Sequence, residues 1–199
     1  MTLDSLSRRS VLKSITLGAA AGSVLSVIPL QAAEHIHNMI ESEKADAPAG
    51  LYTPRFFNDH DYKTLHALCE TILPADADAG GAIEAGAPEF IDLLTSENTD
   101  YQSRLGGGIR WLDAECTKRY GKLYLDAAPD QQKQILDLIA YRKNAVADPS
   151  LAPAVEFFAF LRNLVSDGFF TSKIGIKYLG YKGNTYRLDF PGCPPVPGV

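Results

Sequence analysis

The residues that could carry chemistry are few and widely separated in this sequence. Its three cysteines, Cys69, Cys116 and Cys193, lack the close spacing that iron–sulfur clusters usually need, and no Cys-x-x-Cys-His stretch offers covalent haem attachment. Cys69 and Cys116 occupy apolar positions of helical patterns, which favours buried thiols. Cys193 lies in the proline-rich stretch FPGCPPVPGV. We therefore expect Cys193 to be the more reactive thiol, or a bridge to a partner chain.

The histidines do not form a metal-binding pattern. His35 and His37 are two positions apart, and His60 and His66 are six apart on one expected helix, where they face different sides. Two ligands on one helix face need a spacing of three or four. We expect exposed or partly buried imidazoles without a metal.

The acidic stretch DADAGGAIE has a partial likeness to a calcium-binding loop. Asp76 and Asp78 match the first and third positions of such a loop, and Gly81 matches its turn glycine. Gly80 and Ala87, however, occupy the fifth and twelfth positions, so two oxygen ligands are missing. A solvated acidic loop is the better interpretation.

Motifs for a cofactor or for catalysis are missing elsewhere. The glycines of GGAIEAG and LGGGI do not follow a strand, as those of a dinucleotide-binding motif do. There is no Gly-x-Ser-x-Gly nucleophile elbow. The sequence therefore predicts no catalytic, cofactor-binding or metal-binding residue in this chain.

The N-terminal stretch SRRSVLK has the pattern of a twin-arginine export signal. The residues that fit this pattern are Ser7, Arg8, Arg9, Leu12 and Lys13, and Val11 stands where phenylalanine is commonest. An uncharged run from Ser14 to Leu30 and the small residues of QAAE follow, in the order typical of an export signal.

Residues 1–33 are accordingly predicted to be a signal peptide that is cleaved after Ala32 or Ala33. Leu30 or Gln31 then occupies the −3 position, where a small residue is preferred. A permanent membrane anchor is the alternative, but a spanning helix needs roughly 20 apolar residues, more than this run contains. By resemblance to other twin-arginine substrates, the chain is expected to cross to the periplasm already folded, through the twin-arginine translocase.

Composition places the remainder of the chain among acidic globular domains. The chain has 199 residues and a formal net charge of −5, and residues 1–33 carry three basic side chains and one acidic one. The remainder, about 166 residues, is one ordinary domain by length and carries a charge near −7. Nucleic acid and anionic lipid surfaces are poor partners for such a domain.

Apolar residues recur at helical spacing over five segments, and no alternating strand pattern is present. The expected helices cover residues 58–74, 88–97, 101–124, 128–143 and 152–170. The GGG stretch at 106–108 weakens the third of them and predicts a bend or a close helix contact. The predicted fold class is all-α.

The domain is expected to span residues 56–199. Residues 34–55 are interpreted as a flexible tether, because ESEKADAPAG is polar and lacks apolar periodicity. Gly168 is placed like a glycine that terminates the fifth helix. Residues 169–199, rich in glycine, tyrosine and proline, are expected to form a long irregular tail.

This tail carries aromatic side chains that either pack back on the helices or contact another subunit, where tyrosine and phenylalanine are favoured anchors. The predicted partner interface consists of Phe169, Phe170, Tyr178, Tyr181, Asn184 and Tyr186.

The stretch GFFTSKIGIKYLGYKGN, from Gly168 to Asn184, resembles the signature of the gluconate 2-dehydrogenase subunit 3 family. LHALCETILPAD and FFAFLRNLVSDGFF are similar to earlier segments of that family, so the resemblance covers roughly Phe56 to Pro191. It implies a non-catalytic small subunit of a membrane-associated sugar or sugar-acid dehydrogenase.

The resemblance also implies the partners. The large subunit is an FAD-containing oxidoreductase of the glucose–methanol–choline type, which oxidises an alcohol group of gluconate or a related sugar or polyol. A cytochrome c subunit often takes the electrons onward. The small subunit assists export and maturation of the flavoprotein, which leaves the complex periplasmic and peripheral to the inner membrane.

Two alternatives remain open. The chain could be a stand-alone exported enzyme or metal binder that uses Asp76, Asp78, His60 or His66. It could also be an anchored scaffold whose residues 14–30 stay in the membrane.

Overall fold

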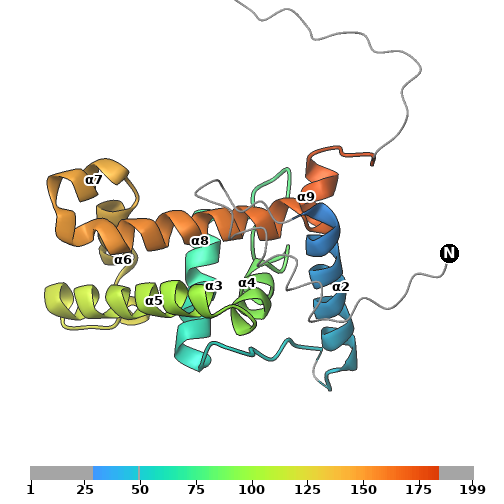
Figure 1. The fold of residues 1–199 in the computed structure, drawn as a ribbon, viewed down its shortest axis with the longest axis horizontal. Coiled ribbons are helices and arrows are strands. Elements are labelled where there is room, and N and C mark those ends of the chain that lie inside the picture. Colours follow the sequence, from blue (N-terminus) through green and yellow to red (C-terminus); the bar gives the residue numbers. More distant parts are fainter. Residues whose placement is uncertain (1–28, 49, 184–199) are drawn as a thin grey trace, which may run out of the picture.

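The structure, a computed structural model, describes residues 29–48 and 50–183, and in these ranges its regular elements are all helices (Figure 1). The elements are α2 (Leu30–Asp46), α3 (Asp59–Ile72), α4 (Ala87–Ser96), α5 (Thr99–Tyr120), the 3₁₀ helix η1 (Tyr124–Asp126), α6 (Pro129–Ile139), α7 (Arg142–Ala147), the 3₁₀ helix η2 (Pro149–Leu151), α8 (Ala152–Phe170) and α9 (Lys173–Tyr178). The predicted all-α class is confirmed. The five expected helices correspond to α3, α4, α5, α6 and α8.

Local signals set several of these helix ends. Asn58 caps α3 by accepting a hydrogen bond from the Asp61 amide at 2.9 Å. Asn98 caps α5 in the same way, with the amides of Asp100 and Tyr101 as donors. Gly121 ends α5 in the left-handed conformation, at φ 70°.

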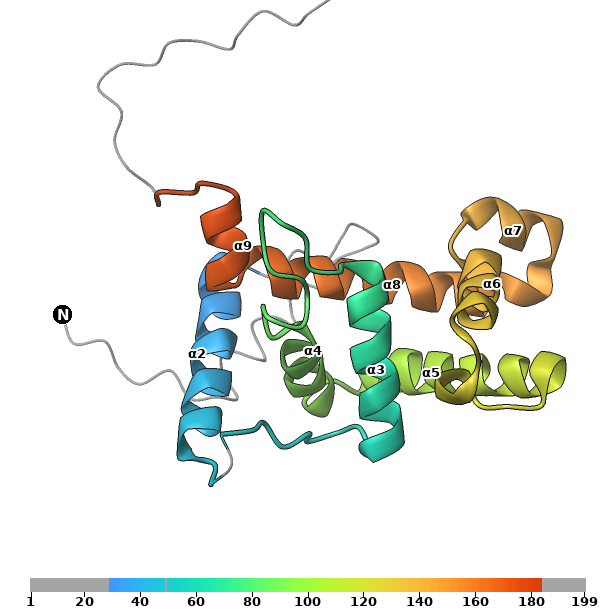
Figure 2. The same cartoon turned by 180° about the vertical axis from the view of Figure 1, so that it is seen from behind.

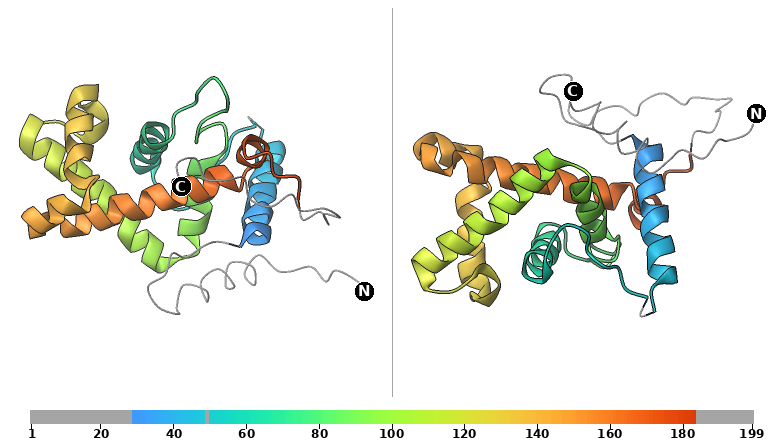
Figure 3. Two further views of the ribbon diagram at one scale, coloured as in Figure 1. Left: turned by 90° about the horizontal axis from the view of Figure 1, so that it is seen from above. Right: turned by 60° about the horizontal axis from the view of Figure 1, so that its bottom comes forward.

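The long helices α5 and α8 run in opposite directions, one above the other in Figure 1, and cross obliquely when seen from above (Figure 3). α3 and α4 lie across this pair, as the view from behind shows (Figure 2). α6 and α7 cover one end, and α2 and α9 lie together at the other. The core between these layers is apolar and includes Leu65, Phe90, Leu112, Ile135 and Leu161.

Two glycines bring helices into close contact. A Cβ atom on Gly108 would lie 2.0 Å from the Phe157 ring of α8, so the predicted close contact at the GGG stretch is confirmed. A Cβ on Gly168 would lie 3.2 Å from Ala87 on α4. Gly168 therefore lies within α8 at a contact, and the prediction that it terminates the helix is wrong.

The interpretation of residues 34–55 as a tether is wrong for its first part. Residues 34–46 belong to α2, whose Ala33, Ile36 and Ile40 recur at helical spacing and are buried. This pattern is short and follows directly on the expected signal run, so the sequence did not indicate a helix here. Burying the two isoleucines contributes about 1.5–3 kcal/mol each, so α2 is part of the folded domain.

The expected irregular tail begins later than residue 169. α8 continues through Phe170, and α9 follows after Thr171 and Ser172. Several predicted residues lie outside the described ranges: Arg8, Arg9, Leu12, Lys13, Asn184, Tyr186 and Cys193.

Candidate partner interface

The turn from α8 into α9 is fixed by one serine and one glycine. The Ser172 hydroxyl donates to the Phe169 carbonyl oxygen at 2.7 Å and accepts from the Gly175 amide at 3.1 Å, which caps α9. A Cβ on Gly175 would lie 2.1 Å from the same Phe169 oxygen, so only glycine permits this close return of the chain. This turn determines where the last aromatic side chains point.

Four large apolar or aromatic side chains on and around α9 are exposed. Their exposed fractions are 39% for Phe170, 54% for Tyr178, 57% for Leu179 and 43% for Tyr181. We call these four residues the α9 patch. Exposed residues of this kind that gather in one place mark contact surfaces on soluble domains.

Phe169 does not belong to this exposed set. It is 3% exposed and meets Phe170 edge-on, with ring centroids 5.0 Å apart, and Tyr178 at 6.4 Å. Phe169 packs beneath the rings of Phe170 and Tyr178 and is buried. The prediction that Phe169 lies on the surface is therefore wrong. The structure thus brings Phe169, Phe170 and Tyr178 together.

His37, on α2, joins the N-terminal helix to this end of the molecule. Its ring stacks on Phe90 with centroids 5.0 Å apart and shares a 3.1 Å hydrogen bond with the Thr171 hydroxyl. Burial lowers the pKa of His37, which keeps the imidazole neutral at neutral pH. Lys173 pairs with Glu41 nearby, with Nζ–Oε2 2.7 Å. Sequence reasoning missed this role, because it placed His37 in a tether.

The buried carboxylate of Asp92 is the second residue that the sequence did not single out. It accepts hydrogen bonds from the Tyr52 hydroxyl at 2.8 Å and from the amides of Arg55, Phe56 and Phe57 at 2.6, 3.1 and 3.0 Å. Its partners hold the segment before α3 against α4. The sequence signal was an acid in the middle of the apolar stretch FIDLL of α4.

Two of the residues considered for catalysis, His60 and Asp76, have structural roles in the described part of the chain. His60 contacts Asp113 at 2.7 Å, and Asp113 also accepts from the Tyr124 amide, which ties α3, α5 and η1 together. Asp76 caps its own loop by accepting from the amides of Asp78 and Ala79. In the described ranges no three His, Cys, Asp or Glu side chains lie close enough to hold a metal.

The two cysteines of the described ranges are free and buried, as predicted. Burial raises the pKa of the Cys69 thiol above its ordinary value, with Glu89 adding to the effect. A thiol in this state is a poor nucleophile, so Cys69 acts as a small apolar core residue.

The arrangement is that of a helical subunit with an exposed apolar patch at one end. A family model, that of gluconate 2-dehydrogenase subunit 3, matches residues 59–192, about two thirds of the chain. The chain therefore belongs to the gluconate 2-dehydrogenase subunit 3 family. Comparisons with curated proteins and with solved structures find no match.

None of the helices from α2 to α9 combines the length and the apolar character that crossing a bilayer requires.

Proposed function

We propose that this chain is the non-catalytic small subunit of a periplasmic, membrane-associated dehydrogenase for sugars, polyols or gluconate. Its partner is an FAD-dependent large subunit of the glucose–methanol–choline type, which holds the cofactor and the catalytic residues. The chain assists the folding of this flavoprotein and carries it through the twin-arginine translocase. Membership of a family named for a dehydrogenase subunit supports the assignment.

The α9 patch is the observation that carries the proposal. Its aromatic rings lie on short, turn-anchored structure at one end of the domain, where they are accessible to a second chain. Tyrosine and phenylalanine supply large contact areas at a low cost in side-chain entropy, which makes them frequent anchors of interfaces. We therefore place the large subunit against Phe170, Tyr178, Leu179 and Tyr181.

Co-expression with the large subunit tests this interface. Changing Phe170, Tyr178 and Tyr181 together to alanine should weaken the complex by about 2 kcal/mol or more, measured as the dissociation constant of the purified subunits. The control changes Tyr141 and Val146, which are 56% and 83% exposed at the far end of the molecule around α7, and should leave binding unchanged. Equal binding by both variants would show that the α9 patch is not the interface.

The export role is tested separately. Changing Arg8 and Arg9 to lysine should abolish the periplasmic activity of the flavoprotein, because the signal then no longer matches the twin-arginine pattern. Total cellular flavoprotein, measured by immunoblot, controls for expression. Undiminished periplasmic activity would contradict joint export.

A further inference from the structure

The peptide bonds predicted as the export-signal cleavage site lie inside the first turn of α2. The amides of Ala32 and Ala33 both donate to the Pro29 carbonyl oxygen, at 2.9 and 3.0 Å. The side chain of Ala33 is fully buried in the core. A protease must hold the residues around the cleaved bond as extended, accessible chain, so the folded domain withholds these bonds.

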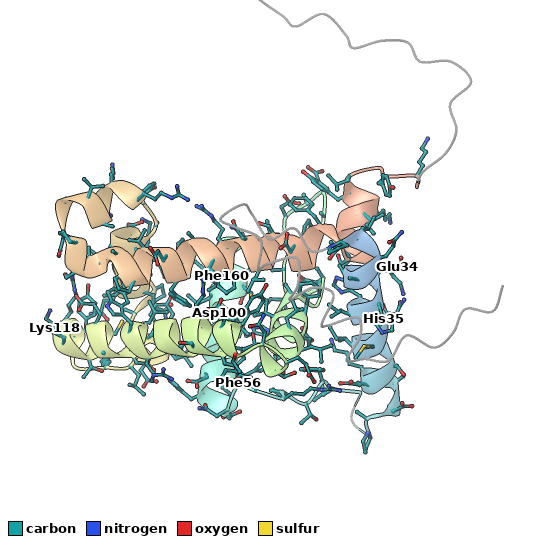
Figure 4. The ribbon with its side chains drawn as sticks, in the orientation of Figure 1. Glu34, His35, Phe56, Asp100, Lys118 and Phe160 are labelled. Atoms are coloured by element: carbon teal, nitrogen blue, oxygen red, sulfur yellow. The ribbon has the colours of Figure 1, made fainter. Side chains whose placement is uncertain are left out.

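Contacts to three other elements hold α2 in place. Ile36 and Ile40 are buried, the His37 ring stacks on Phe90 of α4, and Lys44 pairs with Glu89 of the same helix. His37 contacts Thr171, which follows α8, and Glu41 pairs with Lys173, the first residue of α9. These partners are distant in sequence, so α2 docks only once the domain has folded. Figure 4 shows Glu34 and His35 on this helix, at the end of the molecule opposite Lys118.

We propose that α2 protects the bonds after Ala32 and Ala33, so that the exported chain keeps its N-terminal segment. A twin-arginine substrate arrives folded at the far side of the membrane, with α2 already docked. The uncut chain therefore stays joined to the uncharged run that begins at Ser14. The inference rests on the export part of the proposed function, and it replaces the predicted cleavage of the signal with its retention.

Limited proteolysis of the purified full chain tests the protection without any export. Elastase, whose specificity pocket accepts small side chains, is the probe. It should cut first in the exposed loop at Ala75 and Ala77, and at least tenfold more slowly after Ala32 and Ala33. Cutting after Ala32 or Ala33 as fast as in the loop would overturn the proposal.

Two variants separate docking from local sequence. Changing Ile36 and Ile40 to aspartate should release α2 and speed cutting after Ala32 and Ala33 at least tenfold. Changing the exposed Asn38 and Ser42 to aspartate adds the same charge on the outer face and should leave the rate unchanged. If both variants are cut at the rate of the unaltered chain, docking of α2 is not what protects the bond, and the proposal fails.

The intact mass of the chain recovered from cells completes the test. Protease treatment of spheroplasts first confirms that the domain lies on the periplasmic side. The expected mass includes residues 1–33, whereas a chain that starts at Ala33 or Glu34 would overturn the proposal. If the domain never reaches the periplasm, the proposed function fails and the elastase result alone decides the question of protection.

Discussion

At the scale of single residues, Asp92 shows how one buried charge organises a loop. Its carboxylate satisfies three backbone amides and the Tyr52 hydroxyl, and it is fully buried. A buried carboxylate is costly unless donors surround it, and here the donors all come from the irregular segment that leads into α3. Asp92 therefore determines the course of residues 52–57.

Replacing Asp92 by alanine should destabilise the domain by about 3–5 kcal/mol, because several buried donors lose their acceptor. Urea unfolding followed by circular dichroism measures this change. Tyr52→Phe, which removes only one of the hydrogen bonds, is the matched control and should cost about 1 kcal/mol. Equal losses in the two variants would contradict the central role of the carboxylate.

Asp167 makes the stability of the domain fall as the pH rises. Burial raises the pKa of this carboxyl from 3.8 to about 6. The folded state therefore binds the proton more tightly than the unfolded state, and stability is lost as the pH rises from about 4 to 6. Above pH 6 the carboxylate is charged in both states, and the loss is complete.

Asp167→Asn should accordingly stabilise the domain at pH 7.5, by roughly 1 kcal/mol after allowance for partial solvent screening. The same change should have almost no effect near pH 4. Unfolding curves of both proteins at the two pH values check the difference. A gain of equal size at both values would mean that the charge of Asp167 is not its cause.

At the scale of elements, the crossing of α5 and α8 depends on one glycine of three. Gly108 lies against the Phe157 ring, whereas a Cβ on Gly107 would meet no atom within 4 Å. Both are helical, so both lower the helix propensity by about 1 kcal/mol relative to alanine. Of these two glycines, only Gly108 offsets the loss of helix propensity, because it lets α5 pack closely against α8.

Two neighbouring substitutions should therefore have opposite signs. Gly108→Ala should destabilise the domain by about 1–3 kcal/mol through overpacking against Phe157. Gly107→Ala should stabilise it by up to about 1 kcal/mol, because only helix propensity changes. Thermal unfolding of the two variants gives the comparison, and effects of the same sign would exclude this account of the crossing.

At the scale of the whole molecule, the domain has two distinct ends. α6 and α7 cover one end, and α2, α9 and the α9 patch occupy the other (Figures 1 and 2). The proposed partner surface and the protected bonds of α2 thus share one end.

The sequence by itself determined the all-α class, the five main helices and the family. Apolar residues at steps of three and four report helices locally, and the GFFTSKIGIKYLGYKGN stretch is specific enough to indicate the family. The two buried cysteines were likewise predictable from their apolar helical positions.

The tertiary structure alone decided which of the aromatic residues are exposed, and it alone revealed α2 as part of the core. Phe169 and Phe170 are neighbours in sequence, yet the return of α9 buries the first and leaves the second exposed. His37 and Asp92 gain their roles from partners on distant segments. Exposure and hydrogen bonding depend on where remote parts of the chain come together, and local periodicity carries no information about such encounters.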